Sequence, residues 1–264
     1  IRFADRDLLR LKARQMADLR GHQLAMIFQE PMSSLNPVYR IGDQMLEMIR
    51  THHREIPKKE ALKQCIEMLA RVGIPSPEQR IREFPHQMSG GMRQRVMIAM
   101  ALLCQPKLLI ADEPTTALDV TIQAQILRIL KKLAEESDTS VILITHDMGV
   151  VAEMADHVMV MYAGKSVEYG TAEDIFDHPM HPYTVGLLKS IPKLGSGQED
   201  HLFTIEGTVP GLDEMPAGCR FSTRCPYATE QCKKEDPGMQ GEAGHFVRCF
   251  RFMDPEIQDS REVE

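Results

Sequence analysis

The sequence contains no tryptophan, and aromatic residues make up only 5% of its 264 positions. No apolar run approaches the ~20 residues that a membrane-spanning helix requires, and no signal-peptide pattern is seen at the start. The formal net charge of −7 argues against a general nucleic-acid binder, which would carry a basic patch or an excess of Lys and Arg. We therefore expect a cytosolic protein that reaches any membrane only through a partner.

The residues that are present suit a folded protein with a substantial core. Hydrophobic residues make up 43% of the chain, and its length suits one large or two modest domains. The most informative segment lies between His86 and Asp119, and its first motif is Ser89-Gly90-Gly91. A helical pattern follows at once, and Ser89 suits the N-cap of that helix. The start of the helix would offer unpaired N–H groups and a positive dipole, which are the elements of a phosphate site.

A strand and a pair of carboxylates follow this helix. The run from Leu108 to Ala111 is apolar and has the length of a buried parallel strand, and it is followed by Asp112 and Glu113. In open α/β sheets, ligands bind at the carboxyl ends of the strands. One carboxylate at such a place can serve Mg²⁺ while its neighbour orients a water molecule. Each motif alone is commonly a turn or a solvated strand end, but their order and closeness make the combination specific.

Together, these motifs resemble the nucleotide-binding subunit of an ABC transporter. Ser89 to Gln94 resemble the signature motif, Leu108 to Glu113 the Walker B strand, and Ala117 to Asp119 the D-loop. The resemblance implies an α/β fold, namely a P-loop NTPase-like ABC ATPase core with a mainly parallel sheet. It also implies a helical subdomain and a small Cys-rich C-terminal extension.

Two further polar residues follow apolar strand patterns and extend the resemblance. Gln29 comes after the run from Leu24 to Phe28 and would belong to the Q-loop. His146 comes after the run from Ser140 to Thr145 and would be the switch histidine. Without the other motifs, the first would read as an ordinary loop residue and the second as a structural histidine.

The resemblance also implies a role for each of these residues. Asp112 and Gln29 would hold Mg²⁺, and Glu113 would polarise the attacking water. Gln29 and His146 would contact the γ-phosphate of ATP. Two such subunits pack head to tail in this family, so the signature residues of one subunit close on the ATP held by the other. The residues implied to contact that ATP or to communicate across the dimer are Ser89, Gly90, Gly91, Gln94 and Asp119.

One motif of that family is missing from the sequence. No Gly-x-x-x-x-Gly-Lys-Ser/Thr loop occurs in it, and in the family this Walker A loop precedes the position that corresponds to Ile1. The simplest interpretation is an N-terminally truncated chain, and the alternative is an ATPase that naturally lacks the loop. We expect the 264 residues alone to bind ATP poorly and to be inactive by themselves.

The sequence pattern and the resemblance divide the chain into four segments. Residues 1–30 form the incomplete N-terminal part of the ATPase core, and residues 31–104 form the helical subdomain with the signature motif. Residues 105–170 complete the core. Residues 171–264 form the extension, in which His181-Pro182-Tyr183 resembles the C-terminal region of peptide-importer ATPases. The histidines and prolines around this segment match no usual spacing of metal ligands, so we expect a structural corner.

Four of the six cysteines gather in the extension, at Cys219, Cys225, Cys232 and Cys249. A cytosolic protein should not hold structural disulfides, so such a cluster favours metal or iron–sulfur ligation. The gaps are wider than the tight pairs of a zinc finger or ribbon. Similar clusters follow the same segment in peptide importers, where they can carry a [4Fe–4S] cluster. The alternatives are zinc and free or structural thiols, while Cys65 and Cys104 are expected in helices of the core.

The run from Arg95 to Met100 makes the resemblance closest to the D-type ATPase subunit of bacterial dipeptide/oligopeptide importers. Such a subunit hydrolyses ATP with Mg²⁺ and lies peripherally on the cytoplasmic face of the plasma membrane. The implied partners are two integral membrane permease subunits, a second ABC ATPase subunit in a heterodimer and, indirectly, a solute-binding protein. No nucleic-acid partner is implied.

Three other functions stay open at this point. The same subunit type can serve an importer of nickel or another small solute. A soluble ABC ATPase of DNA repair or translation would share the nucleotide motifs, although the acidic balance and the peptide-importer-like tail speak against it. A metal or redox module, with the ATPase region only as a scaffold, would be a protein of another class.

Overall fold

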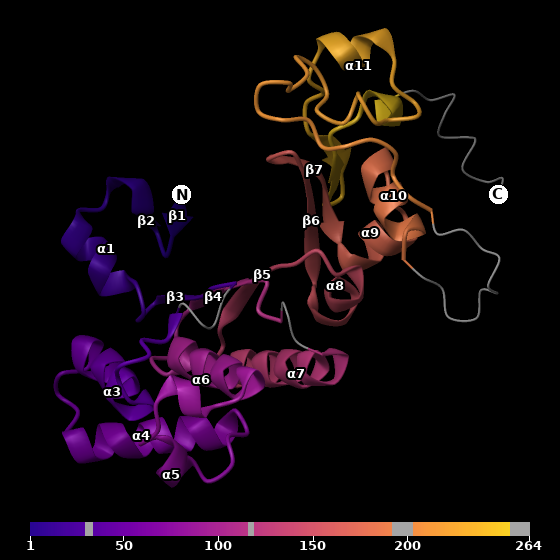
Figure 1. Ribbon diagram of the computed structural model, residues 1–264. Helices are drawn as coiled ribbons and strands as arrows, with labels where there is room; N and C mark the ends of the chain where they lie inside the picture. Colours follow the sequence, from indigo (N-terminus) through magenta and orange to yellow (C-terminus); the bar gives the residue numbers. More distant parts are fainter. Residues whose placement is uncertain (30–33, 116–118, 192–202, 254–264) are drawn as a thin grey trace. The chain divides into compact units, whose positions relative to one another are not determined.

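The computed structural model describes residues 1–29, 34–115, 119–191 and 203–253 (Figure 1). The predicted D-loop residues Ala117 and Leu118 lie outside these ranges, as do the Q-loop residues directly after Gln29. The chain forms two compact units, Ile1–His146 and Asp147–Glu264, which are described in turn. Within the described ranges, no helix is both long and apolar enough to cross a membrane.

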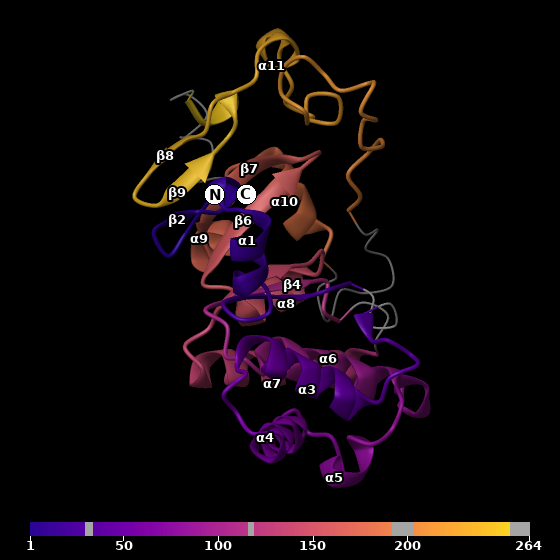
Figure 2. The same ribbon diagram turned by 90° about the vertical axis from the view of Figure 1, so that its left-hand side faces the viewer.

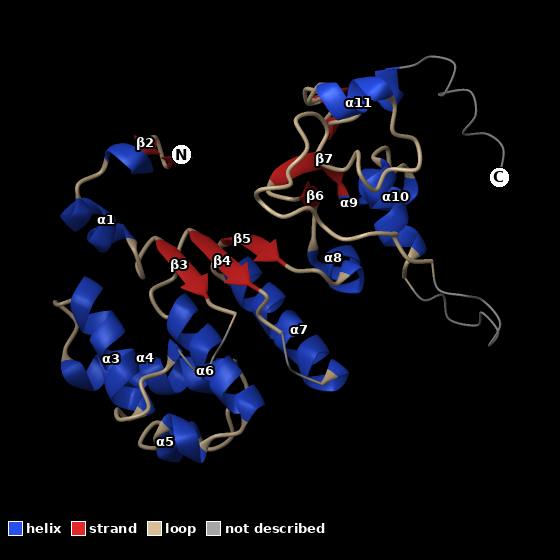
Figure 3. Ribbon diagram, turned by 45° about the horizontal axis from the view of Figure 1, so that its top comes forward, coloured by secondary structure: helices blue, strands red, loops and turns tan. Residues whose placement is uncertain are grey.

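A parallel sheet organises the first unit. Its strands are β3 (Leu24–Ile27), β4 (Leu108–Asp112) and β5 (Ser140–Ile144), in the spatial order β3-β4-β5. The three arrows run in the same direction in Figure 3, and both strand pairs are parallel. The prediction of a parallel sheet, made from three separate apolar runs, is confirmed.

The two faces of this sheet differ in burial. Alternate side chains such as Ala25, Ile27 and Leu109 are almost fully buried. On the other face, Ile142 and Ile144 are about half exposed, at 49% and 46%. A buried strand was expected at β5, but neither of its faces is fully buried: Val141 and Leu143 are half-buried, and the other three residues are exposed.

Two of the helices described in this unit, α6 (Gly90–Leu102) and α7 (Val120–Glu136), lie next to this sheet, and three more lie beyond them or beside them. The other three are α3 (Ile41–His52), α4 (Lys58–Arg71) and α5 (Pro77–Arg80). Figures 1 and 2 both show α6 and α7 next to the sheet, with α4 and α5 farther from it. The apolar stripe of α3 packs against α4 and α6, as the spacing of apolar residues predicts.

The two cysteines of this region are core residues, but only Cys65 lies in a helix, where both were expected. Cys65 on α4 is fully buried, and Cys104 lies just beyond α6 with 8% of its surface exposed. Burial raises the pKa of the Cys65 thiol to about 12 and raises that of Cys104 as well. Both side chains therefore remain neutral thiols at physiological pH.

The start of the chain is more irregular than its charged, helix-compatible pattern suggests. The elements found there are β1 (Arg2–Phe3), β2 (Arg6–Asp7), η1 (Leu8–Arg10) and α1 (Ala13–Leu19). Strands β1 and β2 pair in a short antiparallel hairpin. Of the charged stretch from Arg6 to Arg20, which was expected to suit a helix, only Ala13–Leu19 is α-helical, because Leu11 and Lys12 are extended, with ψ angles of 139° and 154°.

The second unit is built on an antiparallel sheet with the order β6-β7-β9-β8. Its strands are β6 (His157–Tyr162), β7 (Lys165–Thr171), β8 (Gln240–Glu242) and β9 (His245–Val247). A hairpin turn was expected at Gly164-Lys165, and the structure places it one residue earlier: Ala163 and Gly164 have φ angles of 46° and 78°, which a two-residue type I′ hairpin needs.

Short helices complete this unit. They are α8 (Met148–Met154), α9 (Ala172–Asp177), α10 (Pro182–Lys189), α11 (Glu230–Lys234) and η3 (Phe250–Met253). Phe221, from the cysteine-rich segment, packs in one core with Tyr162 of β6 and Val167 of β7. Strand β9 also pairs with β7. The cysteine-rich segment thus shares a sheet and a core with the β6–β7 hairpin, and no structural boundary falls at residue 170.

A buried carboxylate explains the corner predicted around His181. Glu168 of β7 is fully buried, and its oxygens accept hydrogen bonds from the backbone N–H groups of Met180 (2.7 Å) and His181 (2.9 Å). The same carboxylate lies 2.9 Å from Nε2 of His245 on β9. Glu168 therefore fastens two segments that are far apart in the sequence, and the histidine–proline segment is structural, as expected.

Candidate functional site

The carboxylates Asp112 and Glu113 lie where β4 ends. Asp112 is the last residue of the strand, and Glu113 leaves it with a left-handed backbone, at a φ angle of 43°. A non-glycine residue in this region costs on the order of 1–3 kcal/mol, and such residues gather at functional sites. The backbone N–H of Glu113 donates to the carbonyl of Ile144 on β5 at 2.9 Å, which fixes the turn. The sequence gives no sign of this backbone geometry.

Three of the predicted catalytic residues meet at this edge of the sheet. Nε2 of Gln29 donates to Oε2 of Glu113 at 2.7 Å, and Nδ1 of His146 lies 3.2 Å from Oε1 of the same carboxylate. Each residue follows a different parallel strand, and the carboxyl ends of parallel strands share one edge. The predicted convergence of these side chains is therefore seen in the structure.

The hydrogen bonds to Glu113 show which atoms of His146 and Gln29 stay available for other partners. A carboxylate only accepts hydrogen bonds, so Nδ1 of His146 is the donor toward Glu113. Nε2 of this ring is then left to face outward, and 78% of the side chain is exposed. The Gln29 amide uses its nitrogen toward Glu113, which leaves its oxygen available as an acceptor or metal ligand.

The predicted signature motif forms the start of α6. The hydroxyl of Ser89 accepts from the backbone N–H of Met92 at 3.3 Å, so Ser89 is the N-cap, as predicted. A Cβ added at Gly90 would meet no atom within 4 Å, whereas one at Gly91 would lie 3.2 Å from Cγ2 of Ile122. Gly90 thus leaves open space at an exposed helix N-terminus, where anions are stabilised.

Two other predicted site residues have structural partners that the sequence did not suggest. Gln94 is only 2% exposed, and its amide nitrogen donates to the carbonyl of Pro114. Asp119 is the N-cap of α7, where Oδ1 accepts from the N–H of Ile122 at 3.0 Å. Gln94 therefore lies inside the protein, and not on the surface where ATP contact was expected.

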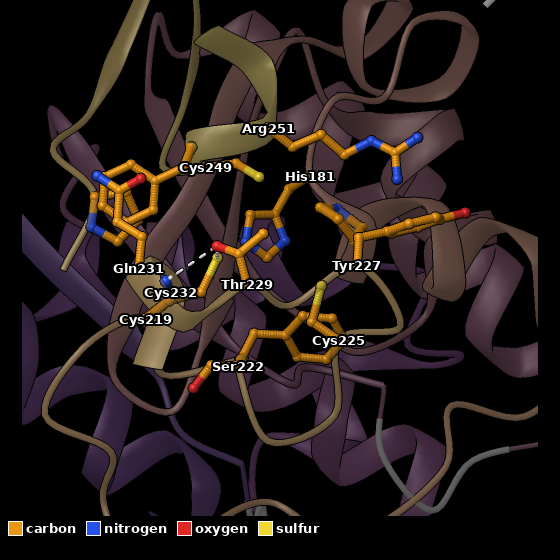
Figure 4. A pocket seen from close by; sticks show the side chains of 14 residues that line it. His181, Cys219, Ser222, Cys225, Tyr227, Thr229, Gln231, Cys232, Cys249 and Arg251 are labelled. Carbon is orange, nitrogen blue, oxygen red and sulfur yellow. Dashed lines mark hydrogen bonds between the residues drawn. The ribbon is translucent and has the colours of Figure 1, made fainter. Parts of the chain in front are cut away.

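The four cysteines of the second unit surround one cavity of about 350 Å³ (Figure 4). Burial raises the pKa of Cys225 to about 11 and also raises the pKa of Cys219 and of Cys249, so these residues are neutral thiols. Within the described residues, no group of three or more His, Cys, Asp or Glu side chains is arranged to hold a metal ion. The predicted grouping of the cysteines is seen, but a formed metal site is not.

His181 also lines this cavity. Burial lowers its pKa to about 4, so the ring is neutral at physiological pH. Its Nδ1 accepts from the backbone N–H of Tyr183 at 3.0 Å and caps α10. The histidine is therefore a structural residue of the corner, as the sequence interpretation held.

Two parts of the chain match families of known proteins. Residues 1–116 match the family described as ABC transporter, and residues 167–232 match the family described as oligopeptide/dipeptide transporter, C-terminal region. Among solved structures, a dimeric ATP-binding cassette in a post-hydrolysis state bound to ADP and phosphate aligns with a TM-score of 0.58. It is 26% identical in sequence, and the alignment covers 64% of this chain and 72% of that one. The class defined by fold and site is thus an ATP-binding cassette.

Curated relatives narrow this class. The chain is 51% identical to the oligopeptide transport ATP-binding protein AppD of Bacillus subtilis, over 98% of this chain and 79% of AppD. It is 54% identical to the oligopeptide transport ATP-binding protein OppD of Haemophilus influenzae, over 88% of this chain and 71% of OppD. The chain belongs to the peptide-transport ATP-binding proteins of the ABC transporter family.

Proposed function

We propose that the protein is the ATP-hydrolysing subunit of an ABC importer that powers the uptake of di- or oligopeptides. The observation that carries the proposal is the meeting of Gln29, Glu113 and His146 at one sheet edge, in a chain whose relatives are peptide-transport proteins. Phosphoryl transfer to water needs positioning and charge stabilisation more than covalent chemistry. A carboxylate held from two sides supplies that positioning.

Each residue of the site has a defined task in this reaction. Glu113 accepts a proton from the attacking water and orients it, while the Gln29 amide holds the carboxylate in place. When the His146 ring carries a proton on both nitrogens, Nδ1 donates to Glu113 and Nε2 can donate to an oxygen of the γ-phosphate. The helix start at Ser89, Gly90 and Gly91 stabilises the phosphates of the ATP bound by the opposite subunit. Asp119, at the start of α7, communicates across the dimer.

The residues present fit Mg²⁺. Asp112 provides a half-buried carboxylate at the end of β4, and the side-chain oxygen of Gln29 is not used toward Glu113. Both are oxygen ligands of the kind that Mg²⁺ prefers, usually with several waters and phosphate oxygens. When bound, the ion neutralises phosphate charge, and Asp112 and Gln29 would hold it.

Transport requires partners on the membrane. The protein would attach peripherally to the cytoplasmic face of the plasma membrane through two integral permease subunits, and it would pair with a second ABC ATPase subunit. A solute-binding protein would choose the cargo. Nickel or another small solute is the alternative cargo for the same subunit type, and a soluble ATPase of DNA repair or translation is the alternative of another class.

Reconstitution of the transporter tests this proposal. We expect the protein to co-purify with its permease subunits, and its ATPase activity in proteoliposomes to rise when a peptide-loaded binding protein is added. Binding protein loaded with nickel serves as the control. Purification free of membrane subunits would favour the soluble alternative. ATPase stimulation only by the nickel-loaded binding protein would identify nickel as the transported solute.

For the cysteines, we propose ligation of one [4Fe–4S] cluster by Cys219, Cys225, Cys232 and Cys249, with zinc as the alternative. Two observations support this ligation: the four cysteines line one cavity, and cysteine sulfur is a ligand that soft metals prefer. Ligation requires the thiols to lose their protons, and a metal supplies the charge that makes this favourable despite burial. The cluster would then be structural or sensory.

Anaerobic purification distinguishes these alternatives. We expect a brown protein that contains iron and acid-labile sulfide, and Cys225→Ser should lose both. Cys104→Ala is the matched control, because this thiol lies in the other unit, and it should retain the iron. Stoichiometric zinc without sulfide would establish a zinc site. Absence of both metals would leave the cysteines as structural thiols.

A further inference from the structure

Gln94 connects the signature helix to the catalytic loop. It lies in α6, one helical turn after Gly90, so the two residues share a helix face. Its side chain is 2% exposed, and its amide nitrogen donates to the carbonyl of Pro114. Pro114 directly follows Glu113 in the chain. The amide therefore holds the peptide group that follows Pro114, one residue beyond the catalytic carboxylate.

The two-residue segment Glu113–Pro114 is thereby held at both ends. At one end the N–H of Glu113 donates to the carbonyl of Ile144 at 2.9 Å. At the other end the carbonyl of Pro114 accepts from Gln94. Between these two anchors Glu113 keeps a φ angle of 43°, which a residue other than glycine rarely adopts. This backbone angle sets the direction in which the side chain of Glu113 leaves the main chain, and Gln29 and His146 then hold its carboxylate.

The next residue ties the same helix to two other helices. The guanidinium of Arg95 donates to the carbonyl of Val72, at the end of α4, and to Oε1 of Gln125 on α7, both at 2.8 Å. Neighbouring residues of α6 thus bind the helical region on one side and the catalytic loop on the other. A shift of α6 would act on both connections at once.

We propose that Gln94 is a positioning residue for ATP hydrolysis, which couples the position of the signature helix to the orientation of the Glu113 carboxylate. The inference rests on the proposed function. When the start of α6 contacts the phosphates of an opposing ATP, a shift of the helix moves Gln94. Its hydrogen bond transmits this shift to Pro114 and so to the neighbouring Glu113. Hydrolysis is thereby linked to closure of the dimer, through a hydrogen bond inside one subunit.

Removal of the amide in the assembled transporter tests this link. Gln94→Met keeps the volume and deletes the donor. We expect kcat for ATP to fall by ~10- to 100-fold, because a catalytic group misplaced by about 1 Å can cost that much. The KM for ATP should stay within about threefold, since Gln94 does not contact ATP. Gln64→Met, the same change at a partly exposed site on α4, is the control and should leave both constants unchanged.

A double-mutant cycle separates positioning from a general structural role. If Gln94 acts through Glu113, Gln94→Met should lower the residual rate of a Glu113→Gln transporter by less than about twofold. Gln94→Glu, which places an oxygen against the Pro114 carbonyl, should lower kcat at least as much as Gln94→Met does. An undiminished effect in the Glu113→Gln background, or a normal kcat in both single variants, would overturn the inference. A wild-type transporter without peptide-stimulated ATPase activity would instead overturn the proposed function.

Discussion

Glu113→Gln is expected to leave ATP binding intact and to slow hydrolysis by ~10²- to 10⁴-fold, the range for loss of a positioned general base. The amide has nearly the shape of the carboxylate, so the strand end and the neighbouring side chains keep their places. It lacks the negative charge that takes a proton from water. The structure holds this carboxylate with Gln29 at 2.7 Å and His146 at 3.2 Å, which makes its position specific.

Single-turnover hydrolysis and equilibrium binding of ATP in the assembled transporter measure this effect. Glu135→Gln, the same change at an exposed position of α7, is the control and should hydrolyse ATP normally. Asp112→Asn should differ from both by raising the Mg²⁺ concentration that binding requires. A normal rate in Glu113→Gln would show that another residue activates the water.

Gly90→Asp is expected to abolish ATPase activity while leaving the fold intact. A side chain at Gly90 meets open space in this chain, so the isolated protein accommodates it. An aspartate in the first turn of a helix even stabilises it, by ~0.3–1 kcal/mol. Its charge would repel the phosphates of the ATP that approaches this helix start from the opposite subunit. We expect a loss of at least ~10²-fold, similar to the removal of a donor from a transition-state site.

Thermal unfolding and ATPase assays on one preparation check both parts of this prediction. Gly90→Ala, which adds bulk without charge, should keep most of the activity that Gly90→Asp loses. If Gly90→Asp hydrolyses ATP at the normal rate, the helix start does not face phosphate. A lowered unfolding temperature would show instead that the substitution acts on folding.

The sequence predicted most of the catalytic edge, because the relevant signals are local. An apolar run of four or five residues followed by a polar side chain predicts a parallel strand and its carboxyl end. Gln29, Glu113 and His146 each follow such a run, and their strands are neighbours in the sheet. Ser89 as an N-cap is equally local, since the cap and the helix it begins are adjacent in the sequence.

The interactions that sequence patterns did not predict are those between distant residues. The hydrogen bond from Gln94 to Pro114 spans 20 positions, and that between Glu168 and His245 spans 77. Strand β9 was not expected either, because three residues carry too little periodicity to be recognised. Gln94 was expected at the nucleotide because it lies in the signature motif, yet the loop at Pro114 packs over its side chain and buries it. Only packing shows which face of the helix is buried.

The buried carboxylate of Glu168 also has a consequence for how proteins of this kind can vary in length. It loses its side-chain partner if β9 is absent, because His245 is the residue that meets it there. The N–H groups of Met180 and His181 would still donate to it, but the loss of one such hydrogen bond costs ~1.5–3 kcal/mol, a sizeable part of the stability of an ordinary domain. Shorter relatives that end before β9 should therefore carry an uncharged residue at the position of Glu168. Gain of the terminal hairpin and gain of the acidic residue would then be a single evolutionary step.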